Sequence, residues 1–189
     1  MSTGFTCSAE EALKKLKDGN AKYMTAEKSE GNISPALRKD TCENGQKPYA
    51  IVVTCSDSRV IPESIFNAGI GELFVIRVAG NVIDNNQLGS IEYAAGHLGS
   101  PLVVVMGHSH CGAVGAAIGG GAENFISYIT DEIKKAIGAE KDDYKACCLN
   151  VQHSVKKIEE SLGIKKEDEH AVKVCGAVYH LEDGKVEFL

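Results

Sequence analysis

Short apolar runs alternate with amphipathic segments along this chain. Three of the runs, at 49–53, 73–78 and 102–106, are rich in β-branched residues and show no polar alternation. Strands of a parallel sheet have this composition when helices cover both faces of the sheet. The pattern therefore predicts three buried, parallel strands.

The amphipathic segments predict helices between these strands. Apolar residues recur at helical spacing over four segments, namely 9–24, 88–98, 124–137 and 144–162. A fourth strand is predicted at 171–179, and 185–189 is expected to pair with it across a turn at 182–184. Because strands and helices alternate, the predicted fold class is α/β, with a mainly parallel central β-sheet flanked by helices. The C-terminal strand pair and an N-terminal helical arm complete the prediction.

The length of the chain favours one domain. Its 189 residues are enough for a substantial core but too few for two comfortable domains. We expect residues 1–48 to form the helical arm and a connection, and residues 49–189 to form the α/β core. The polar stretch at 25–46 is typical of a connection with room for one short helix.

Composition narrows the classes of partner. A net charge of −6 argues against nucleic acid, because no basic face is available to neutralise phosphates. The longest uniformly apolar stretch, 102–106, is far shorter than a membrane span, and residues 1–17 lack the apolar centre of a signal peptide. The expected location is the cytoplasm. The odd number of seven cysteines favours reduced thiols used for metal binding or catalysis over a disulfide framework.

Metal-type ligands follow two of the predicted strands. Cys55 and His108 each come just after a strand, and Cys111 completes a His-x-x-Cys pair. Ligands bind at the carboxyl edge of open α/β sheets, so these side chains are expected to meet there. Two thiolates and one imidazole fill three of the four positions around a tetrahedral zinc ion, and an open fourth position is typical of a catalytic site.

Other interpretations of the same residues stay open at this point. A closed, structural zinc site would need a fourth protein ligand, for which Cys42 and Cys175 are candidates. The cysteines could also be small buried side chains without a metal. His110 could replace His108, although on an extended segment its side chain would point the opposite way.

Asp57 and Arg59 alternate with Cys55 and would share its face of an extended segment. A guanidinium beside a carboxylate makes a bidentate pair that keeps the carboxylate ionised and oriented. Such a carboxylate next to a metal-bound water can accept its proton in a hydrogen bond. A plain ion pair at the end of a strand is the alternative.

Two segments of the chain are similar to the signature segments of the β-class carbonic anhydrases of bacterial type. They are CSDSRVIPE at 55–63 and GHSHCGAV at 107–114. The resemblance continues, in the same order along the chain, at 16–20, 74–81, 90–94 and 176–179. It therefore extends over nearly the whole sequence.

The resemblance implies one Zn²⁺ per chain, with Cys55, His108 and Cys111 as its ligands. It further implies that Asp57 and Arg59 form a catalytic dyad. The implied reaction is the reversible hydration of carbon dioxide to bicarbonate and a proton, by attack of zinc-bound hydroxide. This would make the protein a lyase, a carbonate dehydratase.

The resemblance also bears on substrate binding and assembly. Gln46, Phe74 and Tyr93 match residues of a narrow substrate cleft that is partly built across a dimer interface. A homodimer, or a larger homo-oligomer, is therefore expected, with the N-terminal helices embracing the partner subunit. The alternatives are a hydrolase of carbonyl sulfide or carbon disulfide on the same scaffold, and a zinc-binding protein without enzymatic activity.

Overall fold

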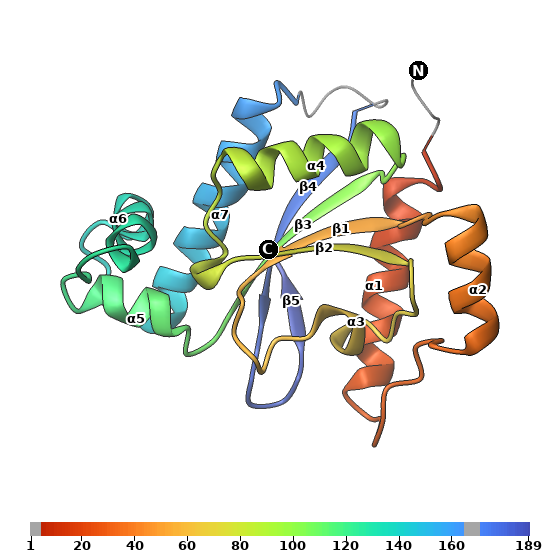
Figure 1. The fold of residues 1–189 in the computed structure, drawn as a ribbon. Coiled ribbons are helices and arrows are strands. Elements are labelled where there is room, and N and C mark those ends of the chain that lie inside the picture. The colour runs from red at the N-terminus through yellow and green to blue at the C-terminus, as the bar shows by residue number, and fades with distance from the viewer. Residues whose placement is uncertain (1–4, 165–170) are drawn as a thin grey trace.

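A five-stranded sheet organises the computed structural model, which describes residues 5–164 and 171–189 (Figure 1). The strands are β1 (Ala50–Thr54), β2 (Leu73–Arg77), β3 (Leu102–His108), β4 (Lys173–Tyr179) and β5 (Val186–Phe188). Their spatial order is β2-β1-β3-β4-β5; all neighbours are parallel except β5, which runs antiparallel to β4. The predicted α/β class, with its mainly parallel sheet and C-terminal strand pair, is confirmed.

Seven α-helices and one short 3₁₀ helix are found in the described part of the chain. They are α1 (Ala9–Tyr23), α2 (Pro35–Asn44), α3 (Pro62–Ile65), η1 (Ala79–Asn81), α4 (Asn85–His97), α5 (Gly112–Ile118), α6 (Ile126–Ile137) and α7 (Asp143–Ser161). The four predicted helices are confirmed as α1, α4, α6 and α7, and α2 is the short helix for which the connection left room. The helix α5 was not predicted, because its run of small residues has no amphipathic period.

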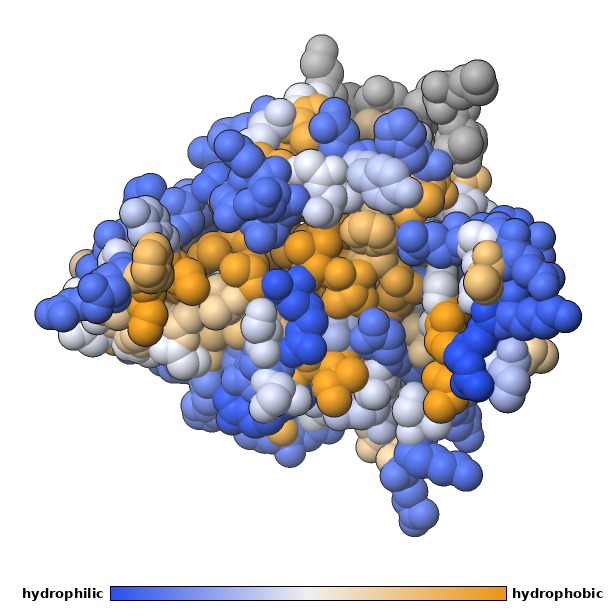
Figure 2. All heavy atoms as spheres, in the orientation of Figure 1, coloured by the Kyte–Doolittle hydropathy of each residue, from blue (hydrophilic) through white to orange (hydrophobic). Residues whose placement is uncertain are grey.

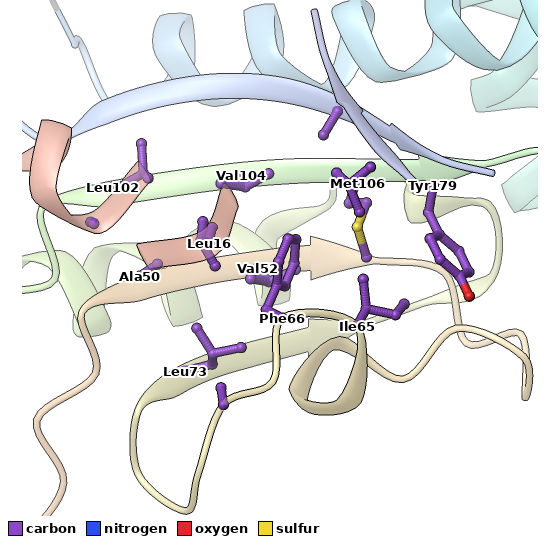
Figure 3. Packing of buried hydrophobic residues seen from close by; sticks show 14 of the residues in the cluster. Leu16, Ala50, Val52, Ile65, Phe66, Leu73, Leu102, Val104, Met106 and Tyr179 are labelled. Atoms are coloured by element: carbon purple, nitrogen blue, oxygen red, sulfur yellow. The ribbon is translucent and has the colours of Figure 1, made fainter. Parts of the chain in front are cut away.

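Helices cover both faces of the sheet, so the core has two layers of side chains around β1 and β3. On one face, Val52 and Met106 pack against Leu16 of α1, and all three are fully buried (Figure 3). On the other face, Ile51 packs in a cluster to which α4 and α7 contribute, Val151 among them. Successive residues of a strand point to opposite faces, so a strand between two helical layers is apolar throughout.

The N-terminal helix α1 lies directly against its own sheet. Ser8 caps it in the expected way: its hydroxyl accepts from the Glu11 N–H, and the Glu11 carboxylate accepts from the Ser8 N–H. At Gly19 the helix touches the chain after α3, where an added Cβ would stand 1.9 Å from the Phe66 carbonyl oxygen. Only glycine allows this approach, which fixes α1 on the core.

A third apolar cluster lies beyond the carboxyl ends of β1 and β3. There α5 and α6 pack on η1 and on α7, and Cys55 and Cys111 belong to the same cluster. The segments that follow β1 and β3 therefore enter a region that α5, α6 and α7 enclose. None of the helices described here is long and apolar enough to cross a membrane.

Candidate metal centre

The three predicted ligands meet at the carboxyl edge of the sheet. Cys55 directly follows β1, His108 is the last residue of β3, and Cys111 is the N-cap of α5. Their sulfur and ring nitrogen atoms all lie within 4.8 Å of one another, and each residue is at most 5% exposed. Among the residues that the structure describes, no other group of His, Cys, Asp or Glu is gathered in this way.

The three residues fit a zinc ion, because one buried ligand atom, His108 Nε2, has no hydrogen-bond partner. His108 is fully buried, and its Nε2 has no hydrogen-bond partner, whereas its Nδ1 lies 2.9 Å from the Ser109 carbonyl oxygen. Because a carbonyl oxygen can only accept, Nδ1 carries the proton and Nε2 presents a bare lone pair. A buried nitrogen without a partner is costly, and a metal ion beside two thiols would remove that cost.

The two thiols have strongly different proton affinities. A hydrogen bond from Cys111 lowers the pKa of Cys55 well below its usual range, against the opposing effect of burial. The Gly80 and Asp57 amides also donate to the Cys55 sulfur, at 3.3 and 3.4 Å. The same thiolate, together with burial, raises the pKa of Cys111. Ligand thiols must be deprotonated, so metal binding would release the proton that Cys111 holds.

Asp57 and Arg59 form the bidentate pair that the sequence predicted. Arg59 Nε donates to Asp57 Oδ1 at 2.9 Å, and Arg59 Nη2 donates to Oδ2 at 2.7 Å. The Arg59 amide adds a third bond to Oδ1 at 2.9 Å. These bonds hold the pKa of Asp57 well below its usual range, although partial burial opposes the effect. Asp57 Oδ2 lies 3.9 Å from His108 Nε2, so the ionised carboxylate borders the ligand group.

The segment that carries this pair is a loop and not an extended strand, so that part of the prediction is wrong. The strand β1 ends at Thr54, and the loop that follows is braced by Arg77 at the end of β2. Arg77 Nε donates to the Cys55 carbonyl at 3.1 Å, and its Nη2 donates to the Asp57 carbonyl at 2.7 Å. This bracing role had no signal in the sequence pattern, because it depends on how β2 pairs with β1.

The three predicted cleft residues lie away from the ligand group of Cys55, His108 and Cys111. Phe74 and Tyr93 form an aromatic pair with ring centroids 6.3 Å apart, and Phe74 stands level with Ile51 near the amino end of β1. Gln46 is exposed and precedes β1 altogether. At about 3.3 Å per residue, the five residues of β1 separate Gln46 from Cys55 by roughly 16 Å. One chain therefore does not bring these residues to the ligand group.

His110 and the alternative zinc ligands also lie outside the group. His110 is not on an extended segment: it has a positive φ of 55°, and its exposed ring lies 2.9 Å from Glu182. Within residues 5–164 and 171–189, neither Cys42 nor Cys175 belongs to a metal-binding cluster. Glu182 also accepts a hydrogen bond from the Ser109 hydroxyl, a contact that sequence reasoning missed.

Comparison with known proteins extends these findings. The family model described as carbonic anhydrase matches residues 50–186 of this chain. The chain is 36% identical to a carbonic anhydrase of Mycolicibacterium smegmatis over 191 residues, which cover 93% of this chain and 91% of that relative. It is 48% identical to carbonic anhydrase 2 of Mycobacterium tuberculosis over 107 residues, or 57% of this chain and 51% of the relative.

Solved structures show the same similarity. The β-carbonic anhydrase CafA of Aspergillus fumigatus superposes with a TM-score of 0.68 and 26% identity, covering 95% of this chain and 89% of that chain. The Coccomyxa β-carbonic anhydrase, solved in complex with acetazolamide, superposes with a TM-score of 0.65 and 27% identity. That match covers 84% of this chain and 86% of the Coccomyxa chain.

Proposed function

Because this chain belongs to the β-carbonic anhydrase family, we propose that it hydrates carbon dioxide with a zinc ion held by Cys55, His108 and Cys111. The observation that carries the proposal is the buried ligand group itself. It gathers two thiols and a bare imidazole nitrogen at the carboxyl edge of the sheet. The reaction takes carbon dioxide and water to bicarbonate and a proton, and it is reversible.

The ligand set supports a catalytic site. Zinc supplies Lewis acidity, which brings the pKa of water toward neutrality and makes a nucleophile available. Three protein ligands leave one position of a tetrahedron for that water, whereas a structural site is closed by a fourth. Once both thiols are deprotonated, Cys55 and Cys111 would offset the charge of Zn²⁺, and the Ser109 carbonyl holds the His108 ring by its other nitrogen.

Asp57 is assigned the role of proton acceptor in the hydrogen bond with the reacting water. Its carboxylate is ionised, and its Oδ2 borders the ligand group at 3.9 Å from His108 Nε2. Arg59 donates to both carboxylate oxygens of Asp57. These bonds keep the carboxylate in one orientation and keep it from binding the zinc ion itself. An oriented acceptor selects the attacking geometry of the water and lowers the cost of ordering it.

The substrate cleft is proposed to form between two copies of the chain. Gln46, Phe74 and Tyr93 cannot reach the ligand group of their own chain, but a partner subunit could present them. Figure 2 shows apolar side chains gathered across the face on which the edge strand β2 lies, and Tyr93 at this edge is 48% exposed. A large exposed apolar surface of this kind marks an interaction site. Phe74 and Tyr93 would line an apolar cleft for carbon dioxide, and the Gln46 amide would donate to a substrate oxygen.

Two assays test the proposal. A stopped-flow measurement should show rapid hydration of carbon dioxide by the zinc protein, with little hydrolysis of carbonyl sulfide or carbon disulfide. Rapid turnover of either sulfur compound without hydration of carbon dioxide would overturn the proposed substrate. Light scattering and activity should also be measured together on a dilution series, where activity should be lost as dimers dissociate. An active monomer would overturn the shared cleft.

A further inference from the structure

The hydrogen bond behind His108 depends on an unusual piece of backbone. His108 Nδ1 donates to the carbonyl oxygen of the next residue, Ser109, at 2.9 Å. The orientation of this carbonyl is set by the peptide unit between Ser109 and His110. His110 has a φ of 55°, a left-handed conformation that is unfavourable for residues other than glycine by about 1–2 kcal/mol. The carbonyl therefore stays in place only if neighbouring groups hold it.

Those neighbouring groups come from the end of β4, from the turn that follows it and from Asp143 at the start of α7, whose Oδ2 accepts from the His110 N–H at 3.0 Å. Ser109 N–H donates to the Tyr179 carbonyl at 3.0 Å, and Ser109 Oγ accepts from the Leu181 N–H at 2.9 Å. The Ser109 hydroxyl in turn donates to Glu182 Oε2 at 3.0 Å. Ser109 is 6% exposed, and these three bonds fix its position.

Glu182 binds both residues that flank the critical peptide. Its Oε2 accepts from Ser109, and its Oε1 lies 2.9 Å from His110 Nε2. One carboxylate thus spans the peptide unit whose carbonyl oxygen accepts from His108. A contact between exposed polar side chains contributes little by itself, but here the two contacts restrain one rotation of the backbone.

The turn is itself anchored from behind by α1. Asn20, which is 4% exposed, donates to the Gly184 carbonyl at 2.9 Å and accepts from the Val186 N–H at 2.9 Å. Glu182 therefore projects from a rigid support and not from a free loop.

We propose that Glu182 and Ser109 are positioning residues for the metal centre: they hold the Ser109 carbonyl at His108 Nδ1 and so orient the imidazole toward zinc. The inference rests on the proposed zinc site. Groups that orient a metal-binding histidine typically contribute 10- to 100-fold to metal affinity or activity. Glu182 acts through Ser109, so the lower end of that range, about tenfold, is expected.

Variants of the two residues test the proposal through metal binding rather than activity alone. Glu182→Ala and Ser109→Ala should each weaken zinc binding about tenfold in competition with a chromophoric chelator. Both should also shift the absorption bands of the cobalt-substituted protein, because the imidazole direction changes. Glu182→Gln retains an oxygen that can accept from Ser109, so its zinc affinity should stay within about threefold of the wild type.

Asp183→Asn is the matched control, since it removes the same charge from the same turn. The Asp183 side chain accepts from the Lys185 N–H within the turn, and asparagine can keep that bond. Wild-type zinc affinity and an unshifted cobalt spectrum in both alanine variants would overturn the inference. So would an affinity loss in Asp183→Asn equal to that in Glu182→Ala. Failure of the wild-type chain to bind zinc would instead overturn the proposed function.

Discussion

Gly107 precedes His108 on β3 and lies against α7 where that helix crosses the sheet. A Cβ added at Gly107 would stand 2.7 Å from Val151 Cγ2 and 2.8 Å from the Cys147 sulfur. Both side chains are buried, at no more than 2% exposure, and Cys147 also donates to the His108 carbonyl. Gly107→Ala therefore forces β3 and α7 apart beside a metal ligand.

The magnitude follows from two opposing effects. Alanine restricts the unfolded chain more than glycine does and would by itself stabilise the fold by about 0.4–1 kcal/mol. Overpacking a full core costs about 1–3 kcal/mol, so the clash should win by about 1–2 kcal/mol. For a chain of this length that lowers Tm by about 2–8 °C. Gly89→Ala is the matched control, because its added Cβ meets nothing within 4 Å and should leave Tm unchanged or higher.

A double-mutant cycle separates the clash from other effects of the substitution. Val151→Ala alone should destabilise the fold by about 2 kcal/mol, because it leaves a cavity. In Gly107→Ala/Val151→Ala the contact with Val151 is relieved while that with Cys147 remains, so the double variant should be about 1 kcal/mol more stable than additivity predicts. Calorimetry on all four proteins measures this coupling. Additive effects, or a Gly107→Ala variant as stable as Gly89→Ala, would refute the packing argument.

Two further predictions concern charged groups. Arg59→Ala should lower kcat/KM roughly 10- to 100-fold, the range for groups that orient a metal site, because Asp57 loses both side-chain bonds. Arg59→Lys should recover only part of this, since lysine cannot make the bidentate contact; wild-type kinetics in Arg59→Ala would contradict the assignment. Burial opposes ionisation of Glu132, but hydrogen bonds from Lys135 and Lys157 outweigh it and lower its pKa from 4.5 to about 2. Glu132→Gln should therefore cost about 2 kcal/mol above pH 4.5 in urea unfolding, and the difference should vanish as the pH falls toward 2; a gap that does not depend on pH would contradict this.

Most of the fold could be predicted from the sequence because its signals are local. Strands buried on both faces are continuous apolar runs, and the runs at 49–53, 73–78 and 102–106 correspond to β1, β2 and β3. The helix α5 escaped prediction because its residues, GAVGAAI, are small and apolar on all sides. Its place is set by packing against α6 and α7, which no local pattern reports.

The candidate site divides in the same way. Cys55, His108 and Cys111 could be predicted because strand ends converge at one edge of a parallel sheet. The supporting contacts of Arg77 and Glu182 could not, because they join segments that are far apart in sequence through backbone carbonyls and turn geometry. The positive φ of His110 likewise depends on such contacts. Histidine at this position does not signal it, as a glycine would.

The most direct test of the central claim is to measure zinc content and carbon dioxide hydration on the same samples. Protein stripped of metal should be inactive, and added zinc should restore activity in proportion up to one ion per chain. Cys42→Ser, which replaces an exposed thiol on α2, should behave as the wild type, whereas Cys111→Ser should lose both zinc and activity. Full activity in the stripped protein, or a fully loaded and fully active Cys111→Ser variant, would contradict the account.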